Sequence, residues 1–180
     1  MRTLLIVDVQ NDFLKGGSLE VKNAENIIPV INMLMDKFDF VIASKDWHPQ
    51  KSNHFEKWPV HCVAESPGAE FPFNLECDKV NQIFYKGTDN KDDGYSAFES
   101  TNIKISNYLK EKEIRELYIC GIALEFCVKS TAMDALKENV KVFLIRDAIA
   151  TFSKEKTDID KTYSELKKAG AEIVLAEQIN

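Results

Sequence analysis

Short apolar runs alternate with amphipathic stretches along almost the whole chain, and this alternation constrains the fold more than any other feature. The apolar runs read as buried strands, and the stretches between them repeat apolar residues at helical spacing. Strand and helix in alternation predict a parallel sheet covered by helices. We therefore expect a doubly wound α/β fold with a six-stranded, mostly parallel sheet and helices on both faces. The expected strands are residues 4–9, 40–44, 82–85, 117–120, 140–145 and 173–175, and the expected helices are residues 23–37, 103–112, 125–138 and 154–169, the last closed by Gly170.

Length, charge and cysteine usage bound the class of protein. With 180 residues, one domain spanning residues 1–180 is expected. A net charge of −6 without a basic cluster argues against a nucleic-acid or anionic-membrane partner. No apolar run approaches the roughly 20 residues that span a bilayer, and the one before Asp8 is too short for a signal peptide. The four cysteines have no C-x-x-C spacing, so we expect free thiols and a cytoplasmic protein.

Two long segments interrupt the alternation. Residues 45–81 and residues 87–99 show no convincing helix or strand. Long structureless connections inside a compact domain are usually functional or disordered. Five aromatic residues in the first segment argue against disorder, so we expect a folded loop that builds a site. The charge run at residues 90–93 is expected to be solvated loop.

All three histidines of the chain lie in the first of these segments, in DWHPQKSNHFEKWPVHC at residues 46–62. Asp46 with His48, His54 and His61 offers one carboxylate and three imidazoles. Oxygen and imidazole ligands together suit zinc, ferrous iron, manganese or cobalt. A surface or hydrogen-bonding role is the alternative for each histidine. The clustering of all three beside an aspartate favours a metal site.

The other reactive side chains follow expected strands. In open α/β sheets, ligands bind at the carboxyl ends of the strands. Asp8 ends the first strand, Lys86 follows the third, and Cys127 lies in the first turn of the helix after the fourth. A helix start favours a thiolate, and a nucleophilic thiol needs a base and a charge partner. The alternatives are a buried core thiol, a loop-capping aspartate and a solvated lysine, but the meeting of all three at one rim favours catalysis.

In combination the motifs resemble those of the isochorismatase-like cysteine hydrolases, and within them the nicotinamidase/pyrazinamidase group. The resemblance covers nearly the whole chain and rests on IVDVQNDF with GGSL, SKDWHP, WPVHC, the strand ending in YKG, DGYSAF, and GIALEFCV before a helix. It implies an isochorismatase-like, Rossmann-like three-layer fold. It also implies metal-dependent hydrolysis of nicotinamide to nicotinate and ammonia, a step of NAD salvage, with pyrazinamide as a further substrate.

The resemblance implies a role for each matching residue. Asp8, Lys86 and Cys127 match the catalytic triad, and the backbone N–H groups of Ala123 and Cys127 match the oxyanion hole. Asp46, His48, His54 and His61 match the ligands of one divalent metal ion, zinc first, with iron or manganese as alternatives. Phe13, Trp58, Tyr95 and Ala123 match the substrate pocket, in which Phe13 and Trp58 sandwich the ring. The cis peptide of the family falls at Ile122-Ala123.

One departure bears on function: Leu124-Glu125 stands where common relatives have Thr-Asp. The change removes a hydroxyl near the nucleophile but leaves the backbone donors in place. Two alternatives stay open: a cysteine hydrolase of the same family acting on another amide or N-carbamoyl substrate, against which the metal motif argues, and a non-catalytic metal- or ligand-binding member, which Leu124 favours slightly. The sequence leaves the native metal and the oligomeric state open, a homo-oligomer included.

Overall fold

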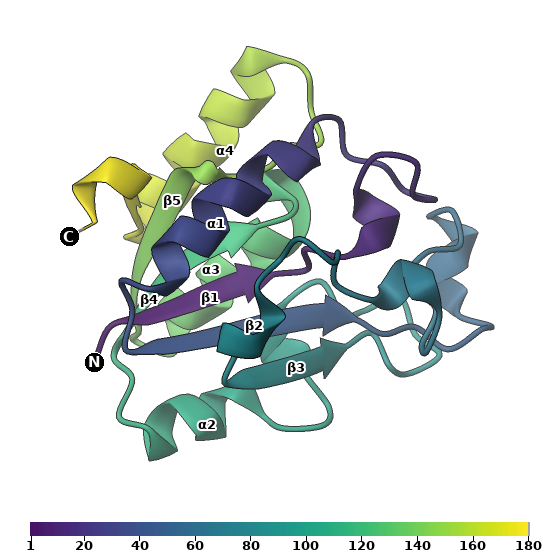
Figure 1. Cartoon of the computed structure of the whole chain (residues 1–180), viewed down its shortest axis with the longest axis horizontal. Helices are drawn as coiled ribbons and strands as arrows, with labels where there is room; N and C mark the ends of the chain where they lie inside the picture. Colours follow the sequence, from purple (N-terminus) through teal and green to yellow (C-terminus); the bar gives the residue numbers. More distant parts are fainter. Residues whose placement is uncertain (180) are drawn as a thin grey trace.

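In the computed structural model, which describes residues 1–179, six strands form one sheet in the order β3-β2-β1-β4-β5-β6 (Figure 1). Every neighbouring pair is parallel, so the expected sheet is confirmed and is parallel throughout. The strands are β1 (Thr3–Val7), β2 (Phe40–Asp46), β3 (Gln82–Lys86), β4 (Glu116–Gly121), β5 (Lys141–Ile149) and β6 (Glu172–Val174).

Helices cover both faces of the sheet, which makes three layers (Figure 1). The first strand shows the division, because Leu4 and Ile6 pack with α1 on one face while Leu5 and Val7 pack with α2, α3 and α4 on the other. All four side chains are fully buried, as a central parallel strand requires. The helices are α1 (Ile28–Met35), α2 (Ile105–Glu111), α3 (Lys129–Lys137) and α4 (Lys156–Ala169).

The boundaries differ from the expected ones where local chemistry interrupts a pattern. The first helix begins as a 3-10 turn at Ala24–Ile27 and becomes α-helical at Ile28, with Pro29 in its first turn. Proline suits that position because the N–H it lacks would have no partner there. Strand β5 continues four residues past its expected end at residue 145, because exposed Arg146 and Asp147 interrupt only the apolar pattern.

The strand order reverses direction between β1 and β4, and in such sheets ligands bind at the carboxyl ends beside this switch point. The long segment after β2 folds over this end of the sheet (Figure 1). It contains 3-10 turns at Asn53–Glu56, Pro67–Ala69 and Cys77–Lys79 rather than long elements. Among the described residues, no helix is both long and apolar enough to cross a membrane.

Candidate active site

A buried lysine lies between two carboxylates at the ends of three adjacent strands. Lys86 Nζ is 2.8 Å from Asp8 Oδ2 and 2.5 Å from Asp46 Oδ1, and it donates to the carbonyl oxygen of Gly94 at 2.6 Å. The second oxygen of Asp8 accepts a hydrogen bond from Ser44 Oγ at 2.7 Å. Parallel register creates this cluster, since Asp46 and Lys86 are direct cross-strand partners. Asp8 and Lys86 are fully buried.

Cys127 reaches the same cluster from the end of β4. It lies in a single π-helical turn, Leu124–Val128, which leads into α3. Its Sγ is 3.5 Å from Lys86 Nζ. The sulfur and one carboxylate oxygen each of Asp8 and Asp46 all lie within 4.8 Å of one another. The three residues expected to form a triad are therefore in contact.

Burial sets the protonation of this cluster. Burial raises the pKa of Asp8 to about 6, although the charge of Lys86 works to lower it. Burial also raises the pKa of the Cys127 thiol well above its usual range, again against Lys86. For Lys86 the neighbouring groups outweigh burial. Burial alone would lower the pKa of the ammonium, but Asp46, Asp8 and Cys127 together raise it. Near neutral pH the lysine is charged, Asp8 is ionised and the thiol keeps its proton.

The expectation that the helix start favours a thiolate is therefore wrong for the resting protein. Cys127 keeps partial contact with solvent, but the desolvation of its sulfur and the nearby carboxylates outweigh the charge of Lys86 and raise the pKa of the thiol. A protonated thiol needs a base before it can act as a nucleophile. Asp8 is the ionised carboxylate beside it, and its Oδ2 has an ion pair to Lys86 but no aligned hydrogen bond within the described part of the chain.

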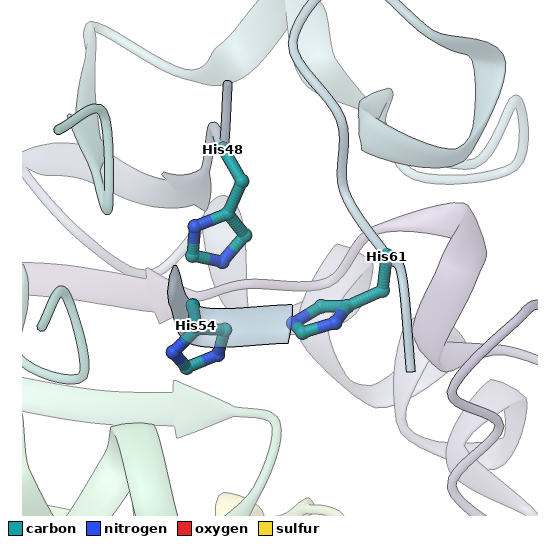
Figure 2. A group of neighbouring side chains, drawn as sticks. All are labelled: His48, His54 and His61. Carbon is teal, nitrogen blue, oxygen red and sulfur yellow. The ribbon is translucent and has the colours of Figure 1, made fainter. Parts of the chain in front are cut away.

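The three histidines form the second part of the site, and Figure 2 shows their rings gathered around a common space. The ring centroids of His48 and His54 are 4.5 Å apart, and those of His48 and His61 are 5.1 Å apart. Each Nδ1 has a partner outside this group. His48 Nδ1 is 3.0 Å from the carbonyl oxygen of Gly87, His54 Nδ1 is 3.1 Å from Asp92 Oδ1, and His61 Nδ1 is 2.7 Å from the carbonyl oxygen of Pro59.

This pattern fits a metal site. Partners on Nδ1 fix each ring and its tautomer, so that Nε2 is left with a lone pair. The Nε2 of His48 is buried and has no hydrogen-bond partner among the described residues, and burial lowers the pKa of this imidazole to about 4. Asp46 Oδ2 lies 3.9 Å from the Nε2 atoms of both His48 and His61. One carboxylate and three imidazoles are a donor set that zinc, iron or manganese accepts.

Asp92 is a residue of this site that the sequence did not reveal. The run at residues 90–93 was expected to be solvated loop, and Asp92 is indeed exposed in an irregular segment, but its side chain also takes part in the site. Its two oxygens contact His54 Nδ1 and Lys57 Nζ, so they connect the second irregular segment to the metal loop. Only its position opposite His54 in space distinguishes Asp92 from its acidic neighbours in the sequence.

A hollow lies between the cluster around Lys86 and the three histidines. Its volume is about 470 Å³, which includes the solvent at its open mouth. Cys127, His54 and His61 border the hollow, so both groups face the same space. All four expected pocket residues, Phe13, Trp58, Tyr95 and Ala123, line it, and so do Phe126 and Phe152, which sequence reasoning missed. No pattern in the sequence distinguishes these two rings from core phenylalanines.

The turn that carries Cys127 shows how the departure at Leu124-Glu125 is accommodated. The cis peptide at Ile122-Ala123 is present, as the resemblance implied. Leu124 is fully buried in the core, so an apolar side chain suits the position. Glu125 accepts hydrogen bonds from the N–H groups of Phe152 at 2.9 Å and Ser153 at 3.1 Å. It therefore joins the turn to the connection that follows β5.

Comparisons with known proteins agree with this geometry. The isochorismatase domain model matches residues 2–178. The nicotinamidase of Acinetobacter baylyi is 39% identical over 169 residues, which cover 81% of this chain and 79% of that protein. The nicotinamidase/pyrazinamidase of Mycobacterium tuberculosis is 34% identical and covers 97% of this chain and 98% of its own length.

Solved structures give the same result. The pyrazinamidase of Pyrococcus horikoshii in complex with zinc has a TM-score of 0.87 and 38% identity over 97% of this chain and 98% of its own. PnC1 from L. infantum in complex with nicotinate has a TM-score of 0.91 and 34% identity, over 98% of this chain and 93% of its own. The fold, the residues at the switch point and these relatives lead to one conclusion: the chain belongs to the isochorismatase family.

Proposed function

We propose that this protein is a nicotinamidase, an amide hydrolase that converts nicotinamide and water into nicotinate and ammonia. One observation carries the proposal: a thiol beside an ionised carboxylate borders the same apolar hollow as two histidines of a metal-ligand set. Nicotinamide is a flat ring that presents a carboxamide and, meta to it, a pyridine nitrogen. The thiol matches the carboxamide, and the metal-ligand set matches the ring nitrogen.

The reaction begins with proton transfer. Asp8 takes the proton of the Cys127 thiol, and the sulfur attacks the carboxamide carbon. The N–H groups of Ala123 and Cys127 stabilise the oxyanion, an effect commonly worth a factor of about 10²–10³ per donor. Asp8 returns the proton to the leaving nitrogen, so ammonia departs and a thioester remains. Asp8 then takes a proton from water, which attacks the thioester, and nicotinate leaves as the thiol is restored.

Lys86 stabilises the charges in these steps. Its ammonium contacts Asp8 and lies 3.5 Å from the sulfur, so it stabilises whichever of them is negative. It cannot act as the acid, because its raised pKa keeps it charged throughout. We assign it an electrostatic and orienting role.

Substrate positioning belongs to the histidine half of the site. Asp46, His48, His54 and His61 would hold one divalent ion, zinc in the first place, which supplies a Lewis acid for the ring nitrogen when bound. Phe13 and Trp58 provide apolar walls for the ring. The relatives named above support nicotinamide as substrate, and two of them also suggest pyrazinamide. The four free cysteines suit a reducing, cytoplasmic location.

Ammonia release from purified, metal-loaded protein tests the proposal. The panel contains nicotinamide, pyrazinamide, benzamide and an N-carbamoyl amino acid, and elemental analysis of the same sample identifies the metal. We expect the highest kcat/KM on nicotinamide and a lower value on benzamide, which lacks the ring nitrogen. A preference for the N-carbamoyl compound would favour the related hydrolase. Release from no compound by metal-loaded protein would favour a binding protein.

A further inference from the structure

Three aromatic rings pack edge to face at the hollow, and they come from three separate parts of the chain. The centroids of Trp58 and Phe126 are 5.0 Å apart with an interplanar angle of 90°, and those of Trp58 and Phe152 are 6.1 Å apart at 88°. Phe126 and Phe152 are 5.7 Å apart, also at 88°. These separations and angles are those of favourable aromatic pairs. Because all three residues line the hollow, together they form one continuous apolar wall.

Phe152 is the exposed member of this wall. It lies on the connection between β5 and α4, and the residue keeps 43% of its exposure to solvent. A phenylalanine on such a connection, held only by ring contacts, could move away from the hollow. Its position therefore depends on how the backbone of the connection is held.

Glu125 holds that backbone. One carboxylate oxygen accepts from the N–H of Phe152 at 2.9 Å, and the other accepts from the N–H of Ser153 at 3.1 Å. Hydrogen bonds to a charged acceptor are roughly twice as strong as neutral ones. Glu125 lies two residues before Cys127, so the turn that carries the thiol also fixes the exposed ring of the pocket wall.

The charge of the hollow adds a second constraint. Within the described chain, no lysine or arginine lines it, and Asp46 is one of its walls. The nearest buried cation, Lys86, is already paired with Asp8 and Asp46. At the aromatic wall a substrate carboxylate would lose hydration, and only the proposed metal ion could compensate for that loss. A flat, uncharged ring loses little hydration and gains aromatic contacts.

We propose that Phe152 is a specificity-determining wall that selects flat aromatic amides, and that Glu125 is the positioning residue that keeps it in place. The inference deepens the proposed function and rests on it. Glu125 acts through Phe152 in this scheme and not on the reacting atoms. Its effect should therefore fall on KM rather than kcat, and it should disappear when the ring is absent.

Steady-state kinetics on Phe152→Ala, Phe152→Leu, Glu125→Ala, Glu125→Gln and the double variant Glu125→Ala/Phe152→Ala test this. We expect Phe152→Ala to raise KM for nicotinamide about tenfold with little change in kcat, and Phe152→Leu to raise it less. Glu125→Ala should raise KM a few-fold, Glu125→Gln less, and the double variant no more than Phe152→Ala alone. Phe73→Ala, which removes a fully exposed ring elsewhere, is the matched control.

Two results would overturn the inference. An unchanged KM in both Phe152 variants would remove the ring from the recognition of substrate. If Glu125→Ala raised KM by the same factor in the parent protein and in Phe152→Ala, Glu125 would act by another route. Ammonia release by the parent protein reports on the proposed function separately. If the parent releases none, calorimetric Kd values for nicotinamide in the same variants still decide the role of Phe152.

Discussion

The two halves of the pocket are built in different ways. Asp8 and Lys86 lie at the ends of strands, are fully buried, and owe their positions to the register of a parallel sheet. His54 and His61 lie on an irregular connection and are oriented by single contacts to Asp92 and to the carbonyl oxygen of Pro59. The sheet preorganises the reactive groups, whereas the loop depends on a few bonds and on a shared metal ion. Changes in the loop should therefore affect binding before they affect chemistry.

Asp46 belongs to both halves. Its Oδ1 contacts Lys86, and its Oδ2 points toward the Nε2 atoms of His48 and His61. Although burial works to raise its pKa, Lys86 and the two histidines outweigh burial and lower it, so this carboxylate stays charged. A change at Asp46 would disturb both halves, so the comparison is better tested at residues that belong to only one.

The largest effect is expected at the nucleophile. Cys127→Ala should lower kcat by at least about 10⁴-fold, because no other group can form the thioester. Its metal content should stay unchanged, since the sulfur is not among the expected ligands. An ammonia assay and elemental analysis of one preparation measure both. Near-normal turnover in this variant would rule out the covalent mechanism.

The next effect tests the loop half alone. Asp92→Asn should weaken metal binding about 10–100-fold, because it removes the charged partner of His54 Nδ1. With saturating metal, kcat should return to the parent value. Competition with a chelator measures the affinity, and Asp89→Asn, in an exposed ion pair of the same segment, is the control. If both variants bound metal as the parent does, Asp92 would not orient His54. Full removal of metal should raise KM for nicotinamide more than Asp92→Asn does.

The pH dependence tests the sheet half. Asp8 must be ionised to accept the thiol proton, and its pKa is raised by burial to about 6. Below pH 6, kcat/KM should therefore fall about tenfold per unit, and above it the value should level off. Protonation of the histidines at low pH would also lower activity, by releasing the metal. The metal content is therefore measured at each pH, so that this loss can be separated from the titration of Asp8. A limb near pH 4 with metal retained would mean that another group is the base.

The smallest effect concerns the support of Trp58. Its indole N–H donates to the hydroxyl of Tyr95 at 2.9 Å, so Tyr95→Phe should leave this donor without its partner. A lost hydrogen bond of this kind is worth about 1 kcal/mol, which predicts a few-fold rise in KM and an unchanged kcat. Tyr118→Phe, which alters a ring stacked on Phe143, is the control. A fall in kcat equal to the rise in KM would place Tyr95 in the chemistry instead.

The sequence placed correctly those site residues that lie next to strong local patterns. Asp8, Lys86 and Cys127 were found because each follows an apolar strand, and the carboxyl ends of parallel strands must meet. The histidines were found because they cluster, and the cis peptide because the surrounding motif resembles a known one. The catalytic and ligand roles of these residues stay predictions. Asp92, Phe126 and Phe152 were missed because each contacts its partners only across long separations in sequence.

The sequence by itself determined the sheet, its helices and the reactive groups at one rim, because apolar periodicity and strand ends are local features of the chain. Only the tertiary structure decided the protonation of those groups. Cys127 keeps its proton because burial and two nearby carboxylates outweigh the charge of Lys86, a balance that no local pattern reveals. Only the tertiary structure, too, brought Glu125 to the backbone of Phe152 and Asp92 to His54. Hydrogen bonds and desolvation depend on distances in space, and folding alone sets those distances.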